Sequence, residues 1–274
     1  SRMDTVFLPA IYPLVHICEP SHAIRRAAIW LGWTVVQHGT QAAVDDMFRR
    51  VCALSTDSDP TVRGQACSML GGFGGVSEHC LQQAFDKKPL GLVAPSRSTV
   101  SSYSCLTAEA PHGDLAVTDF DSTSAASWAG AFVHGWEDEY KEVRSAAVWA
   151  SSELALASPQ MGGKCVALLV ELFNDDAEKV RTNAVSAVSR LVHLIVLDDE
   201  LMAMVLTTLE DAAAHVRRAV FRLVENARLN SDRHIMQITQ GLLNAVERHA
   251  EDASRVMECC RSLGLRHAEA VERL

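Results

Sequence analysis

Histidines, cysteines and arginine doublets are the residues of this 274-residue sequence whose chemistry could serve catalysis or ligand binding. Eleven histidines and eight cysteines could hold a metal or supply a nucleophile, and arginine doublets could bind a phosphate. Their spacing argues against the common sites. The sequence has no His-Glu-x-x-His, no Cys-x-x-Cys, no Gly-x-Ser-x-Gly and no Gly-x4-Gly-Lys-Ser/Thr motif. We therefore expect a protein without catalytic residues or a metal site.

The composition narrows the class of protein further. The chain is 48% hydrophobic and 22% charged, and its aromatic content is only 6%, which favours helices over an all-β fold. Its net charge of -9 disfavours a broadly positive surface for nucleic acid. The scattered cysteines are typical of reduced thiols in the cytosol or nucleus.

An internal repeat is the strongest signal in the sequence. Five segments align on a Val-Arg or Ile-Arg pair, with intervals of 38, 81, 37 and 36 residues between the arginines Arg25, Arg63, Arg144, Arg181 and Arg217. An acid stands five residues before each Val or Ile, and small or apolar residues follow it at offsets of four and eleven. These offsets lie on one face of a helix. Each period therefore predicts a helix, a turn that holds the acid, and a second helix.

The start of the second helix is marked by capping residues. Asp59 before Pro60 is the clearest, and Asp176 is expected to cap its helix in the same way. The first helices are expected near residues 42–54, 163–173 and 199–209, and a last pair near 232–249 and 253–263. Paired helices of this period predict an all-α fold, an α-solenoid of HEAT-type helical hairpin repeats.

One interval exceeds the period by about 44 residues, which indicates an insertion. We expect HEAT repeats over 4–86, a flexible Ser/Pro/Thr-rich insertion over 87–122, and a second block of repeats over 123–274. In HEAT proteins the turn acid and the arginine form a ladder between neighbouring repeats. The expected ladder residues are Asp57, Arg63, Asp138, Arg144, Asp175, Arg181, Asp211 and Arg217. We expect Arg181 to support a carboxylate such as Asp175 or Asp138.

Two further arginines have no expected role in the ladder. Arg26 and Arg218 follow ladder arginines at equivalent positions, so they could share one edge of the array. Solvated helix faces are the simpler interpretation. The alternative is a small electropositive pocket for a phosphate-bearing ligand or an acidic partner segment.

Several segments resemble one family in particular. They are Gly130 to Glu139, reading GAFVHGWEDE, Glu142 to Val148, Leu172 to Arg181, Leu209 to Asp211, Phe85 to Lys88 and Leu263 to His267. Together they resemble the Integrator subunit 4 family from about Ile17 to His267. The run from His134 to Glu139 is expected at a turn between the helices of a repeat, where His134, Trp136, Glu137 and Glu139 are candidates for partner binding.

The resemblance implies a non-catalytic nuclear scaffold. In that family the subunit holds a metallo-β-lactamase-type RNA endonuclease and its inactive paralogue, for small nuclear RNA 3'-end processing and transcription attenuation. It implies other Integrator subunits as partners, RNA only indirectly, no membrane, and an inositol polyphosphate as a ligand of that module. Family members continue into a C-terminal domain, so the second block is expected to be truncated before it.

Two alternatives remain open at this point. A generic HEAT-repeat adaptor for other proteins would fit the repeats equally well. A HEAT-type enzyme is the weaker alternative, because catalytic members of that class hold iron with repeated His-Glu pairs. None of the eleven histidines here is followed by glutamate.

Overall fold

The computed structural model describes residues 21–23, 25–27, 40–88, 128–229 and 231–272, and within these ranges it is helical without a β-strand. The expected insertion lies almost wholly outside this part, so the domain bounds given above stay predictions. The chain divides into two compact units, residues 1–150 and 151–274. Among the described helices, none is long and apolar enough to cross a membrane.

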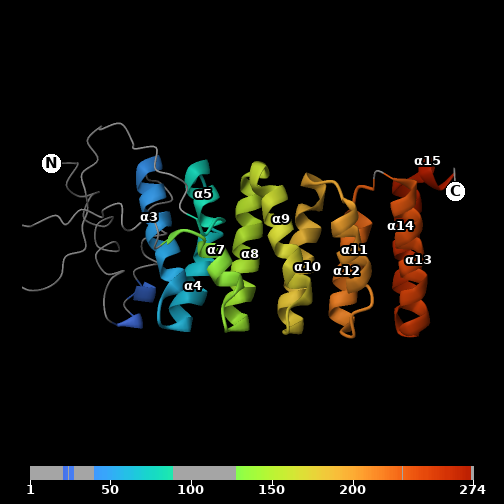
Figure 1. The fold of residues 1–274 in the computed structure, drawn as a ribbon, viewed down its shortest axis with the longest axis horizontal. Coiled ribbons are helices and arrows are strands. Elements are labelled where there is room, and N and C mark those ends of the chain that lie inside the picture. The colour runs from blue at the N-terminus through green and yellow to red at the C-terminus, as the bar shows by residue number, and fades with distance from the viewer. Residues whose placement is uncertain (1–20, 24, 28–39, 89–127, 230, 273–274) are drawn as a thin grey trace, which may run out of the picture. The chain divides into compact units, whose positions relative to one another are not determined.

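The first unit pairs helices from both sides of the insertion (Figure 1). Helix α3 packs on α4 and α5, and α7 contacts both α4 and α5. Its helices are α3 (Gln41–Ala53), α4 (Pro60–Leu70), α5 (Glu78–Ala84), α7 (Ala131–Trp136) and the first part of α8 (Lys141–Ala157). The Gly130 N–H donates to the Gln83 carbonyl at 2.9 Å. The chain on either side of the insertion is therefore brought together.

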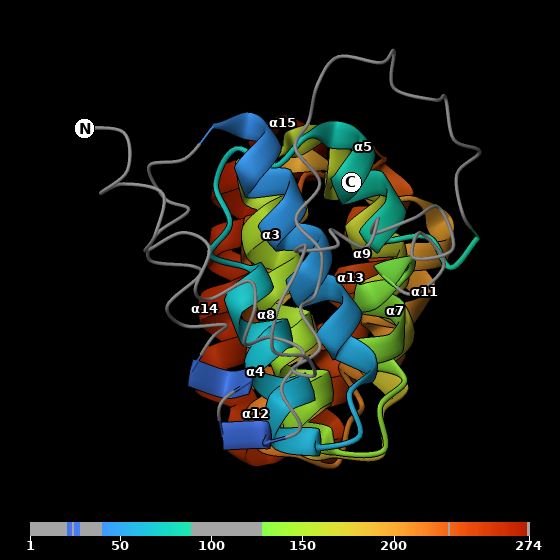
Figure 2. The same cartoon turned by 90° about the vertical axis from the view of Figure 1, so that its left-hand side faces the viewer.

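The second unit repeats one hairpin three times. The pairs are α9 (Gly162–Glu171) with α10 (Glu178–Leu191), α11 (Asp199–Thr208) with α12 (Ala214–Asn226), and α13 (Asp232–Arg248) with α14 (Ala253–Arg266), followed by α15 (Ala268–Val271). In Figure 2, α12 and α14 lie on one side of this unit and α11 and α13 on the other. The structure confirms the expected fold class of stacked helical hairpins.

Amphipathic helix faces build the core of these hairpins. In α10 the fully buried residues Val180, Ala184, Val188 and Leu191 recur at intervals of four and three, which places them on one stripe. The same stripe in α12 is buried by Val216, Val220 and Val224. Because each hairpin buries only part of its surface by itself, the neighbouring hairpin completes the core.

The helix caps match the sequence at one position and differ at another. Asp59 caps α4, with the Thr61 and Val62 N–H groups donating to its side chain and Pro60 in the first turn. Asp176 does not cap α10, which is a correction. Ala177 occupies the N-cap position, and its N–H donates to Asp175 at 2.8 Å. This bond orders the turn before α10, and no side chain in the described part of the chain caps the helix itself.

We expect the Asp59 cap to make stability depend on acid pH. The hydroxyl of Thr61, with the Thr61 and Val62 N–H groups, holds the pKa of Asp59 below its ordinary range. A lowered pKa means that the ionised form stabilises the fold above the unfolded pKa of about 3.9, and that this contribution is lost as the pH falls through the lowered value. In Asp59→Asn, melting temperatures measured from pH 7 to pH 3 should fall less steeply than those of the wild type. Parallel curves would contradict this.

Candidate functional site

The ladder arginines reach from one repeat to the next. In the first unit, the Arg25 Nη2 donates to Asp57 Oδ1 at 2.7 Å, and Arg63 donates to both carboxylate oxygens of Asp138, at 2.6 and 3.1 Å. In the second unit, Arg181 binds both oxygens of Asp211 at 2.8 and 3.1 Å. Two parallel N–H···O bonds fix the geometry more firmly than one. We call this series of pairs the arginine ladder.

Four of the arginines also hold the turn of their own repeat. The Nη1 group donates to the carbonyl of the turn acid six residues earlier, at 2.8 to 2.9 Å, in Arg63, Arg144, Arg181 and Arg217. The acids are used twice as well, because each accepts the N–H two residues further on, at 2.7 to 2.9 Å, in Asp57, Asp138, Asp175 and Asp211. The expected ladder residues therefore bind the backbone of their own turns, and Arg63, Arg181 and Arg217 also bind the following repeat.

The partners of two arginines differ from the sequence-based expectation. The carboxylate that Arg181 binds is that of Asp211, in the following repeat, and not Asp175 or Asp138. Arg217 binds Asp252 at 2.6 Å and Glu251 at 3.0 Å, two residues that the sequence reasoning missed. The available signal was Glu251, which stands five residues before Val256 as the other turn acids do before their Val.

We expect Arg181→Ala to lower the free energy of unfolding by about 1 to 3 kcal/mol, because Asp211 would remain mostly buried without its cation. The hydrogen bond with Asp211 also raises the pKa of Arg181, which keeps the guanidinium charged. Chemical denaturation followed by circular dichroism would measure the loss. An unchanged midpoint would show that the pair contributes nothing to stability.

The turn expected over His134 to Glu139 is present only after Trp136, where the chain connects α7 to α8. Most of segment 130–139 lies in α7, and Phe132 and Trp136 are buried at 0% and 5% exposure beside Phe85. A Cβ on Gly135 would lie 2.7 Å from the Ala147 Cβ, so only glycine allows this approach. Trp136 is therefore a core residue, which corrects its expected role in partner binding.

The other three candidates in this segment remain accessible. His134 is half-buried, while Glu137 and Glu139 are exposed. Glu137 pairs with Lys87 at 2.5 Å, and Glu139 lies 3.5 Å from Arg63 at the edge of the ladder. Both pairs are exposed on at least one side, so solvent weakens them. Partner binding by His134, Glu137 and Glu139 stays a prediction.

Arg26 and Arg218 line separate cavities, one in each unit. Arg26 shares its cavity with Glu142. Arg218 lies with two more arginines and three acids, in the set Arg218, Arg222, Arg255, Glu251, Asp252 and Glu258. Each lining has as many acidic as basic residues, so neither cavity is the electropositive pocket that the sequence suggested. Binding of a phosphate-bearing ligand or an inositol polyphosphate at Arg26 and Arg218 stays untested.

The cysteines of the described part are poor nucleophiles in this fold. Burial raises the pKa of Cys67 and of Cys165 to about 12, and it raises the pKa of Cys52 and Cys80 as well. Because the thiolate is the reactive form, these thiols are unreactive at neutral pH. Within the same part of the chain, no group of three or more His, Cys, Asp or Glu residues is placed to hold a metal ion.

Comparison with solved structures defines the class. A designed armadillo repeat protein solved with the peptide (KR)4 matches 95% of this chain and 98% of its own length, with a TM-score of 0.52 and 15% identity. A second set of designed armadillo repeat proteins, made for modular peptide recognition, matches 95% of this chain and 99% of its own, with a TM-score of 0.52 and 14% identity. Fold and ladder together make this chain an α-helical repeat protein of the HEAT and armadillo class.

Comparison of sequences identifies the relatives. The chain is 31% identical over 271 residues to Integrator complex subunit 4 of Homo sapiens, covering 90% of this chain and 28% of the human protein. It is 29% identical over 240 residues to Integrator complex subunit 4 of Drosophila melanogaster, covering 83% of this chain and 23% of that protein. No protein-family model matches. The resemblance drawn from the sequence is confirmed, and the chain spans about a quarter of these relatives' length.

Proposed function

We propose that this chain is a non-catalytic scaffold segment of the Integrator complex that holds the metallo-β-lactamase-type RNA endonuclease and its inactive paralogue. This role serves small nuclear RNA 3'-end processing and transcription attenuation in the nucleus. The observation that carries the proposal is the similarity to Integrator complex subunit 4 over 90% of the chain, together with a repeat fold suited to binding proteins.

The placement of the polar side chains supports a scaffold. The recurring arginines and acids bind each other and the backbone of their own turns, so repeat stacking explains them without a reaction. The buried thiols are protonated at neutral pH. The chemistry that remains accessible is that of a surface that binds other proteins.

We assign partner binding to the exposed charged side chains in and next to segment 130–139. Glu137 and Lys87 are 60% and 44% exposed, so a partner can compete for either charge at little cost. His134 lies in the last turn of α7, just before this pair, and adds a half-buried side chain. A charge reversal here should change binding without disturbing the core.

Affinity purification from nuclear extract tests this proposal. A tagged chain expressed in cells of its source should recover other Integrator subunits, with the endonuclease and its paralogue among the most abundant proteins identified by mass spectrometry. Glu137→Lys should recover them less well, while Glu171→Lys, also exposed and on α9 of the other unit, serves as the matched control. Recovery of an unrelated complex without Integrator subunits would refute the assignment.

A further inference from the structure

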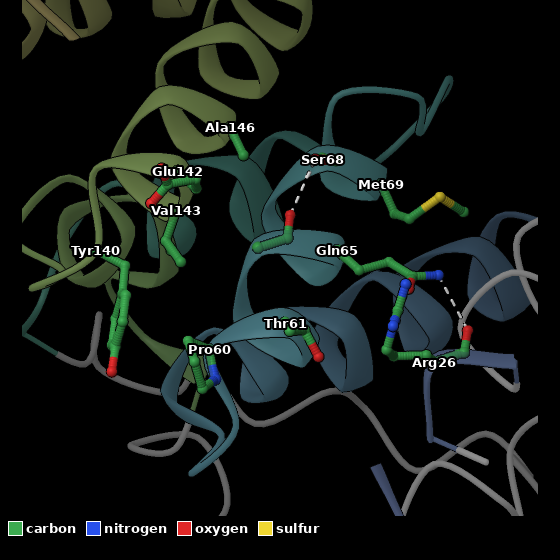
Figure 3. A pocket seen from close by; sticks show the side chains of 11 residues that line it. Arg26, Pro60, Thr61, Gln65, Ser68, Met69, Tyr140, Glu142, Val143 and Ala146 are labelled. Atoms are coloured by element: carbon green, nitrogen blue, oxygen red, sulfur yellow. Dashed lines mark hydrogen bonds between the residues drawn. The ribbon is translucent and has the colours of Figure 1, made fainter. Parts of the chain in front are cut away.

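A groove of about 850 Å³ crosses the second helices of successive repeats in the first unit (Figure 3). Arg26 lies at one end, Tyr140 and Glu142 lie at the other, and α4 forms the floor between them. Most of the lining is apolar or small, and the residues that matter for binding are Arg26, Thr61, Gly64, Ser68, Tyr140 and Glu142. We refer to it as the α4 groove.

Among the described residues, none packs so closely on Gly64, on the floor, that the position requires glycine. Within the described part of the chain, a Cβ built at this position would meet only the Val143 Cγ2, at the ordinary contact distance of 3.7 Å. Glycine inside a helix is less favourable than alanine, because it loses more backbone freedom on folding. By contrast, Gly71 at the end of the same helix would clash with the Ala150 backbone at 2.7 Å, so packing requires it. Gly64 leaves the backbone of α4 open to a close approach from the groove.

The two ends of the groove carry opposite charges that the described residues do not neutralise. Arg26 Nε donates to Gln65 Oε1 at 2.7 Å, and no ion pair with a carboxylate holds its guanidinium within the described part of the chain. Glu142 is exposed and likewise has no cationic partner among those residues. A ligand that brings an acid to Arg26 and a base to Glu142 would satisfy both.

The side chains that line the α4 groove are held in place, and their hydroxyl oxygens can accept hydrogen bonds from the main chain of a ligand. The Arg63 guanidinium lies 5.6 Å from the centre of the Tyr140 ring, and the Tyr140 N–H donates to Asp138, so the ladder holds this aromatic wall in place. Thr61 and Ser68 use their hydroxyl protons within α4 and its cap. Their oxygens retain lone pairs that accept from N–H groups, which an extended segment offers and a helix interior does not.

We propose that the α4 groove binds an extended segment of a partner protein in which an apolar side chain is flanked by an acidic residue on one side and a basic residue on the other. The acid pairs with Arg26, the apolar side chain lies over Gly64 beside Tyr140, and the base pairs with Glu142. This binding function goes beyond the Integrator scaffold role and does not depend on it, since it is argued from the groove alone.

Selection from a phage library of random 16-residue peptides tests the proposal. The wild-type chain should enrich peptides with an acid and a base on opposite sides of an apolar residue. In the doubly reversed variant Arg26→Glu/Glu142→Arg the two charges change places, so the selected peptides should show the opposite charge order. No enrichment, or the same consensus from both proteins, would overturn the proposal. Because the library contains no Integrator protein, its result is separate from that of the affinity purification.

A blocked groove provides the second measurement. In Gly64→Leu the new side chain has room at its base and fills the floor, so the melting temperature should hold or rise while a selected peptide binds at least about tenfold more weakly. Gly163→Leu on α9 is the matched control, because it is also a helical glycine with open space around it. Unchanged peptide affinity in folded Gly64→Leu would place the binding elsewhere and overturn the proposal.

Discussion

Arg217→Ala is expected to lower the free energy of unfolding by about 3 to 5 kcal/mol, one of the two largest effects that we predict. Arg217 is 1% exposed and Asp252 is 4% exposed, and their side chains meet at 2.6 Å. Removal of the arginine leaves a buried carboxylate without a cation. It also frees the Asp211 and Ala212 carbonyls, which accept from Arg217 Nη1. Chemical denaturation followed by circular dichroism measures the loss.

Two further variants distinguish the stability lost with this ion pair from the stability lost with side-chain packing. Arg190→Ala removes a pair with Glu153 in which the side chains are 39% and 47% exposed, so it should cost less than about 1 kcal/mol. The double replacement Arg217→Met/Asp252→Leu removes both charges together and should recover most of the lost stability. If it were as unstable as Arg217→Ala, shape and packing rather than the unpaired carboxylate would be the cause.

Trp136→Ala is expected to cost about 3 to 5 kcal/mol, because it opens a cavity in the aromatic cluster of the first unit. The Trp136 ring lies 5.8 Å from Phe85 and 6.2 Å from Phe132, measured between ring centres. His134→Ala, two residues earlier and half-buried, should change stability by far less. Thermal unfolding followed by circular dichroism compares the two.

The same pair of variants also distinguishes structure from binding. Trp136→Ala should reduce partner binding only as far as it unfolds the first unit, whereas His134→Ala should alter binding with the fold intact. A Trp136→Ala protein that keeps the wild-type melting temperature and loses its partners would contradict the core assignment.

Much of the fold follows from the period of one dipeptide. Arg63, Arg144, Arg181 and Arg217 stand at intervals that a helical hairpin repeat explains, and the buried stripe follows from offsets of four and eleven. The direction of each pair is not contained in that pattern. Whether Arg181 binds an acid of its own repeat or of the next depends on how hairpins stack, and the structure places Asp211 there.

The candidate site was harder to predict for a related reason. A run such as that from Gly130 to Glu139 shows family membership but not which side chains face out, because family-specific residues also arise from close packing. Gly135 and Trp136 are explained by close packing and do not face out. The α4 groove left no motif, since its lining residues come from three helices separated in the sequence.

Binding of the purified chain to the recombinant endonuclease and paralogue pair tests the central claim most directly. A pull-down from purified components, combined with an RNA cleavage assay, should show that the chain retains the pair and that cleavage requires the endonuclease. Glu137→Lys should weaken retention while Glu171→Lys does not. Failure to retain the pair, or cleavage of RNA by the chain alone, would contradict the scaffold account.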